Sequence, residues 1–161
     1  AGKPDLVLRV KDEYDGAEPS GNSVAVMNLL RLAQFTGSPE LRERAGRALR
    51  AFAGPLRDTP AAVPHMLSAL GDFLAPPRQI VIAGEREAEG TAALLKAVNA
   101  RYLPGAVLLL ACEDSRERLA AWNPPVREML PPGGESAAYV CRDFVCQLPV
   151  SEPARLAELL Q

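Results

Sequence analysis

The chain has 161 residues and a net charge of −2. This charge gives no basic footprint for binding nucleic acid or an anionic membrane surface, so we expect neither as a partner. A hydrophobic content of 48% and a charged content of 24% are typical of a soluble chain with one or two small domains. Apolar runs such as residues 106–112 are far too short to span a bilayer, which needs about 20 residues.

The segment from Asp15 to Ser23 places two carboxylates, an amide and two hydroxyls directly before an apolar stretch. One interpretation is an ordinary loop and helix cap, because Ser20, Asn22 or Ser23 could each accept hydrogen bonds from the free N–H groups of a helix start. Glu18 precedes the cap, so it cannot be the returning acid of a capping box. Asp15 and Glu18 therefore exceed what a cap requires, and a functional role stays open.

Residues 1–76 have a helical pattern. The first helix is apolar over much of its circumference, which is typical of a helix covered on two faces. Ser38-Pro39-Glu40 predicts the start of a second helix, which we expect Gly54-Pro55 to stop. A third helix is predicted from Pro64. Its expected buried face consists of Met66, Leu67, Leu70, Phe73 and Leu74.

Residues 77–161 follow a different period, and the prolines at 76 and 77 mark the expected boundary. A strand at 79–83, a helix at 87–102 and a strand at 106–111 predict a parallel βαβ unit. A proline-rich excursion over 122–134 follows, in which we expect Trp122 to anchor the loop to the core. Residues 137–141 and 145–148 predict a hairpin, and Ser151-Glu152-Pro153 begins a final short helix.

The turn after the first predicted strand does not favour a nucleotide. Residues 84–90 lack the Gly-x-Gly-x-x-Gly spacing that lets the backbone approach a pyrophosphate. Glu85, Glu87 and Glu89 would also repel a phosphate at the helix start. We therefore expect a structural α/β part without a bound cofactor.

The three cysteines are an odd number, which argues against a secreted disulfide framework and indicates a cytoplasmic protein. Cys141 and Cys146 could form a disulfide across the predicted hairpin if they face each other, although a reducing compartment disfavours it. The alternative is that these two and Cys112 are small buried hydrophobes. The single histidine, His65, is expected to be a surface or capping residue at a helix start, so we predict no zinc site.

Several separate motifs occur in an order that resembles a known family. They are residues 15–23, 28–32, 35–37 and 79–84, Ala138-Tyr139-Val140-Cys141 with Cys146, and the tail from Pro153 to Leu160. In this order they resemble the C-terminal part of the thioredoxin-domain-containing family of spermatogenesis-associated protein 20 and its bacterial relatives.

The resemblance implies a larger parent protein with a thioredoxin-like domain, followed by a six-hairpin (α/α)6 barrel like those of glycosidases and N-acylglucosamine 2-epimerases. Because this chain has no Cys-x-x-Cys motif and does not start with Met, we expect it to be the final piece of that architecture, without redox activity of its own. The expected fold class is thus mixed α and β: residues 1–76 resemble the end of the barrel, and residues 77–161 form a small α/β appendage.

Two hypotheses of function follow. In the first, the chain catalyses nothing by itself, and it packs against the thioredoxin-like and barrel regions of the parent. The isolated piece would then self-associate or become mobile, because barrel helices would lack their neighbours. In the second, the parent is a carbohydrate-active epimerase or hydrolase, in which Asp15 and Glu18 are the catalytic acid/base pair and Ser20 and Asn22 bind a small carbohydrate.

Overall fold

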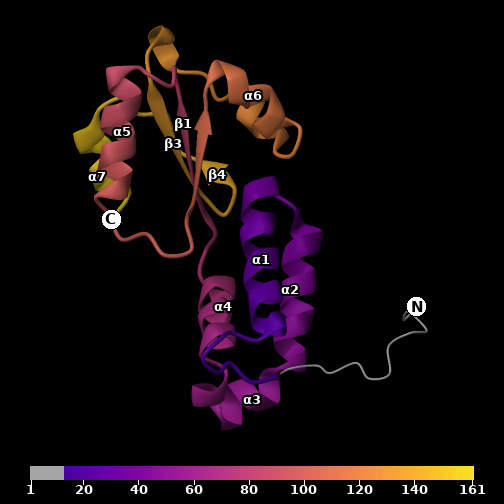
Figure 1. Cartoon of the computed structure of the whole chain (residues 1–161). Coiled ribbons are helices and arrows are strands. Elements are labelled where there is room, and N and C mark those ends of the chain that lie inside the picture. The colour runs from indigo at the N-terminus through magenta and orange to yellow at the C-terminus, as the bar shows by residue number, and fades with distance from the viewer. Residues whose placement is uncertain (1–12) are drawn as a thin grey trace. The chain divides into compact units, whose positions relative to one another are not determined.

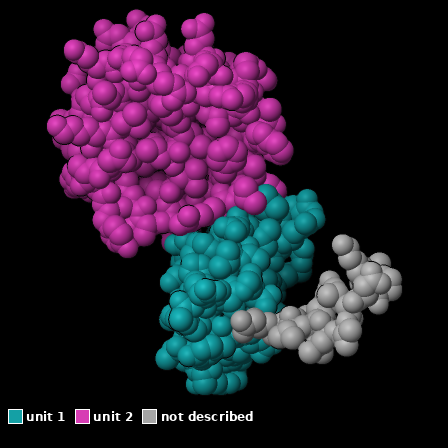
Figure 2. Space-filling model, in the orientation of Figure 1, with its two compact units in different colours: residues 1–30, 40–74 teal, residues 31–39, 75–161 magenta. Residues whose placement is uncertain are grey.

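The computed structural model describes residues 13–161 (Figure 1). Within this range, seven α-helices and a four-stranded mixed sheet are present, which confirms the mixed α and β fold class. The chain divides into two compact units, residues 1–30 with 40–74 and residues 31–39 with 75–161 (Figure 2). We call the first the helical unit and the second the sheet unit. Residues 31–39 thus group with a part of the chain that follows them by some 40 positions in sequence.

Four α-helices precede the sheet: α1 (Gly21–Thr36), α2 (Pro39–Ala51), α3 (Ala53–Asp58) and α4 (Pro64–Leu74). The predicted starts at Pro39 and Pro64 are both confirmed, because proline lacks only an N–H that the first helical turn leaves free in any case. The core of the helical unit is made by Val26, Leu30, Ala45, Leu49, Val63, Met66 and Ala69.

Two expectations for this unit are wrong. Gly54-Pro55 does not stop the second helix: α2 ends earlier, at Ala51, and both residues lie in the first turn of α3, where a proline is tolerated. In α4, the buried residues are Met66 and Ala69, whereas Leu67 and Leu74 are exposed. An apolar side chain therefore does not identify the inner face of this helix.

The sheet unit contains the strands β1 (Arg78–Ala83), β2 (Val107–Ala111), β3 (Ala137–Arg142) and β4 (Val145–Cys146), and the helices α5 (Glu89–Asn99), α6 (Glu113–Ala120) and α7 (Pro153–Leu159). Short 3-10 turns, η2 (Pro124–Glu128) and η3 (Pro132–Gly134), follow α6. The strand order is β2-β1-β3-β4. β1 pairs with β2 in parallel and with β3 antiparallel, and β3 pairs antiparallel with β4. The predicted βαβ unit and hairpin are confirmed.

Both faces of β1 are covered, which explains why the strand is apolar at successive positions. Ile80 and Ile82 pack in one cluster with Leu94 of α5 and Leu156 of α7. Val81 points to the opposite face, where the second cluster includes Val126 of η2. Figure 1 shows α5 and α7 on one side of the sheet and α6 on the other.

Two features between β2 and β3 differ from expectation. The helix α6 was not predicted, since most of its eight residues are polar and give no apolar stripe. Trp122 does not anchor the following loop, because its side chain is 67% exposed. Val126 and Met129 are buried instead and hold the loop to the sheet. Among the described helices, none has both the length and the apolar character needed to cross a membrane.

Candidate functional site

Asp15 is a buried carboxylate that joins two helix starts. Its side chain is only 5% exposed. One carboxylate oxygen, Oδ1, accepts a hydrogen bond from the backbone N–H of Ser20 (2.8 Å). The other, Oδ2, accepts from the backbone N–H groups of His65 (2.8 Å) and Met66 (3.1 Å) in the first turn of α4. Asp15 therefore satisfies free N–H groups of Ser20 and His65, which lie 45 positions apart in the sequence.

The reason for this long-range cap lies in the sequence before α4. The residue that precedes Pro64 is Val63, whose side chain has no hydrogen-bond acceptor. The first-turn N–H groups of α4 therefore need an acceptor from elsewhere, and a carboxylate is also favoured by the positive end of the helix dipole. The backbone N–H of Asp15 in turn donates to Ala62 O (2.9 Å), which fixes the loop beside α4.

Ser20 is the cap of α1, one of the alternatives that the sequence left open. Its Oγ accepts from the backbone N–H of Ser23 (3.2 Å) and lies 2.9 Å from Ser23 Oγ. Both serines are fully buried. With Asp15 they form a small polar cluster, which we call the cap cluster: Asp15, Ser20 and Ser23.

The cap cluster holds Asp15 in its ionised form. Burial raises the pKa of this carboxyl group, but hydrogen bonds from Ser20, Ser23, Met66 and His65 outweigh that effect, and the net pKa lies below its ordinary value of 3.8. A carboxylate with a lowered pKa is a poor proton donor near neutral pH. The geometry suits a charged side chain that holds the starts of α1 and α4 in place.

The other predicted site residues have different surroundings. Glu18 is exposed, and its backbone carbonyl accepts from the N–H of Gly16 (3.1 Å) in a tight turn. Asn22 is half-buried in the first turn of α1. The structure thus separates the two carboxylates by environment, one buried and hydrogen-bonded, the other open to solvent.

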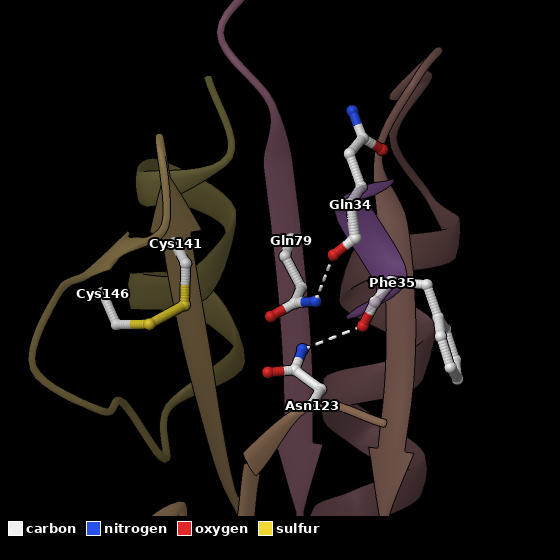
Figure 3. Close-up of a disulfide and its surroundings, with 6 residues drawn as sticks. All are labelled: Gln34, Phe35, Gln79, Asn123, Cys141 and Cys146. Carbon is white, nitrogen blue, oxygen red and sulfur yellow. Dashed lines mark hydrogen bonds between the residues drawn. A yellow bond between two sulfur atoms is a disulfide. The ribbon is translucent and has the colours of Figure 1, made fainter. Parts of the chain in front are cut away.

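Sequence reasoning missed a second polar arrangement, shown in Figure 3. Within the sheet unit, the side-chain amide of Gln79 on β1 donates to the backbone carbonyl of Gln34 (2.9 Å). The amide of Asn123 donates to the carbonyl of Phe35 (2.9 Å). Both carbonyls belong to the last turn of α1, where backbone acceptors lack intrahelical partners. We call the two donor residues, Gln79 and Asn123, the amide caps.

Cys141 and Cys146 are bonded to each other across the β3–β4 hairpin (Figure 3). The expectation that all cysteines are buried small hydrophobes is therefore wrong for this pair, and Cys146 is exposed. It holds for Cys112, which is buried and has a free thiol. The register explains the bond, because the two residues stand directly opposite each other on paired strands.

A pocket of about 420 Å³ lies beside the carboxyl end of β1 in the sheet unit. Its charged lining consists of Glu85, Glu135 and Glu152, and Ser136 and Gly90 also line it. Carboxylates at this position disfavour a phosphate group, which agrees with the sequence argument against nucleotide binding. In the range 13–161, no cluster of three or more Asp, Glu, His or Cys side chains could hold a metal ion.

These features define a mixed α/β protein in which Asp15, Gln79 and Asn123 serve as long-range helix caps. Its sequence is similar to spermatogenesis-associated protein 20 of Homo sapiens, with 40% identity over 155 residues, and to the proteins of the same name of Mus musculus and Rattus norvegicus, each with 38% identity over 156 residues. The aligned region covers 96–97% of this chain but only 20% of each relative. The chain thus spans about a fifth of the length of these proteins. No protein-family model matches the chain, and no solved structure does.

Proposed function

We propose that this chain is one part of a longer protein of the spermatogenesis-associated protein 20 family, in which it has a structural and binding role without a catalytic centre of its own. The observation that carries the proposal is the occupied carboxylate of Asp15. Three backbone N–H groups already use its two oxygens, so little capacity remains for a substrate.

In this proposal, the helical unit is the end of a glycosidase- or epimerase-like barrel, and the sheet unit is an α/β appendage of a cytoplasmic parent. Support comes from the similarity over 96% of the chain and from apolar side chains that the described residues leave exposed. Val24 and Leu67 of the helical unit are examples, at 37% and 44% exposure. Other regions of the parent, including its thioredoxin-like domain, are the proposed partners, and the isolated chain would self-associate through such side chains.

A carbohydrate-active parent enzyme is the second candidate. The observation that favours it is the exposed carboxylate of Glu18, which lies three positions from Asp15 in the loop that precedes Asn22 and the first turn of α1. A free carboxylate can bind sugar hydroxyls or transfer a proton, whereas Asp15 would orient the loop. In this form of the hypothesis, Glu18 carries more of the chemistry than Asp15.

The experiment is a thermal-shift screen of the intact longer protein with monosaccharides, amino sugars and sugar phosphates, since a ligand that binds only the folded state raises the melting temperature. The structural proposal expects no stabilisation by any sugar, a lower melting temperature for Asp15→Asn, and an unchanged one for Glu18→Gln. A sugar that stabilises the wild type but not Glu18→Gln would overturn that proposal and establish a carbohydrate site at this loop.

A further inference from the structure

The disulfide lies at the edge of the sheet that is formed by its shortest strand. β4 is one of the two edge strands and contains only Val145 and Cys146. Its two register pairs with β3 are Cys141 with Cys146 and Arg142 with Val145. The turn between them consists of Asp143 and Phe144, both with positive φ (50° and 62°), as a two-residue hairpin of this hand requires. The bond therefore adds to the backbone pairing of this short strand, which the N–H of Gln147 continues by donating to Val140 O (3.0 Å).

The two cysteines differ in their exposure to solvent. Cys141 is 1% exposed and packs in the cluster that contains Val81, Leu109 and Val126. Cys146 is exposed, and its neighbour Val145 is 73% exposed. A thiol that arrives from solvent can therefore reach the Cys146 side of the bond and is excluded from the Cys141 side. Thiol–disulfide exchange depends on which sulfur is accessible to attack.

We propose that Cys141 and Cys146 form a reversible thiol–disulfide exchange site for soluble low-molecular-weight thiols, such as glutathione. The thiolate of the small thiol attacks Cys146 Sγ, a new S–S bond forms there, and the Cys141–Cys146 bond breaks. Its electron pair goes to Cys141 Sγ, which takes a proton. A second thiol then attacks the sulfur of the first, which releases Cys146 as a thiol and the small thiol as its disulfide. Overall, two small thiols are oxidised and one protein disulfide is reduced.

The register makes the first step reversible. Cys141 is held directly opposite Cys146 by the β3–β4 pairing, and β3 is itself paired with β1 along its whole length. The buried Cys141 thiolate can therefore return to Cys146 Sγ and expel the small thiol. Cys141 is the resolving thiol and Cys146 the exchanging one. The site is a modification site of the hairpin and differs from a Cys-x-x-Cys redox catalyst in sequence spacing and in its place on an edge strand.

The experiment equilibrates the whole chain in glutathione buffers from fully reduced to fully oxidised, quenches with acid and alkylates the free thiols. Peptide mass spectrometry then counts the label on each cysteine. The expected result is that Cys141 and Cys146 lose their label together as one two-electron step, whereas Cys112 never pairs. Cys112 is the internal control because it is buried and free.

Two variants test the asymmetry. With oxidised glutathione, Cys141→Ala should carry a glutathionyl group on Cys146, and Cys146→Ala should carry about tenfold less on Cys141, because burial excludes the attacking disulfide. Circular dichroism checks that both variants are folded. If Cys141→Ala does not fold, the wild type can be trapped with iodoacetamide during reduction by glutathione. This measurement gives the same information, with the glutathionyl group expected on Cys146.

Three results would overturn the proposal. The first is a pair that stays fully alkylated in oxidised glutathione although the chain is folded. The second is a disulfide that stays intact in fully reduced glutathione. The third is a mixed disulfide that forms on Cys141 in preference to Cys146.

Discussion

The carboxylate of Asp15 accepts a hydrogen bond of 2.8 Å from the backbone N–H of His65, a residue 50 positions later in the chain. Because the same carboxylate also binds the N–H groups of Met66 and Ser20, one side chain fixes the starts of both α4 and α1. A single substitution there should loosen two helices at once.

Replacing Asp15 with Ala should therefore reduce the free energy of unfolding by roughly 3 kcal/mol, since hydrogen bonds to a charged group contribute about 1.5–3 kcal/mol each and the variant leaves buried donors unpaired. Asp15→Asn should cost less, because its Oδ1 still accepts while its NH₂ group cannot. Urea unfolding measures both. Glu18→Gln is the matched control and should change stability by less than about 0.5 kcal/mol, as surface substitutions usually do. Equal losses in the free energy of unfolding for Asp15→Ala and Glu18→Gln would contradict the cap role of Asp15.

The lowered pKa of Asp15 has a consequence for acid stability. Burial raises this pKa, but the hydrogen bonds lower it by more, so the folded-state value lies below the unfolded value of 3.8. A group with a lowered folded-state pKa contributes its full stabilisation above the unfolded value and loses it as the pH falls through the folded-state pKa. Below about pH 4, wild-type stability should therefore fall more steeply than that of Asp15→Asn. Urea unfolding at a series of pH values measures both slopes, and parallel slopes would contradict the assignment.

The amide of Gln79 should matter for the sheet unit. Gln79→Met keeps the length of the buried side chain but removes the donor to Gln34 O, so we expect a loss of about 1–2 kcal/mol. Gln147→Met makes the same chemical change at an exposed position and should be nearly neutral. Urea unfolding of the pair gives the comparison. A neutral Gln79→Met would show that the helix end finds another donor.

Replacing glycine with alanine should have opposite effects on stability at Gly84 and at Gly71. A methyl group at Gly84, which follows β1 with φ of 154°, would lie 2.6 Å from Ser136 Oγ and 2.8 Å from Thr91 Oγ1. Those hydroxyls are buried and bonded to each other at 2.7 Å, so they have little room to move. Gly84→Ala should cost roughly 2 kcal/mol or more.

By contrast, a methyl group at Gly71 in α4 has nothing within 4 Å. Gly71→Ala should therefore stabilise the chain by about 0.5–1 kcal/mol through helix propensity. The melting temperatures of the two variants should move in opposite directions, and a shift of the same sign in both would contradict the account.

Local signals in the sequence predicted the elements well where the chain provides them. The β-branched run before Gly84 predicted β1, and the prolines at 39, 64 and 153 predicted three helix starts. The helix α6 was missed because Glu113 to Arg118 offers no apolar periodicity. The acidic residues Glu113 and Asp114 in its first turn were the available signal.

The polar contacts were harder to predict, for a physical reason. The loop at Asp15 was identified as unusual, and Ser20 was one of three candidate caps. The partners of Asp15 are backbone groups of His65 and Met66, and a backbone N–H has no signature in a sequence. Nor could Gln79 be recognised as a cap, since its acceptor is the backbone carbonyl of Gln34. The prediction that Trp122 anchors its loop was wrong because a large apolar side chain is not always buried.

The amide caps also affect where this protein can be cut. Truncation to residues 75–161 would keep every strand and still remove residues 31–39, which belong to the same compact unit. Gln79 and Asn123 would then present amides to an empty space, and Phe35 would be missing from the apolar cluster beneath the sheet. An excised sheet domain is therefore expected to precipitate or to be digested quickly by proteases, whereas a fragment that begins before Gly21 keeps α1 whole.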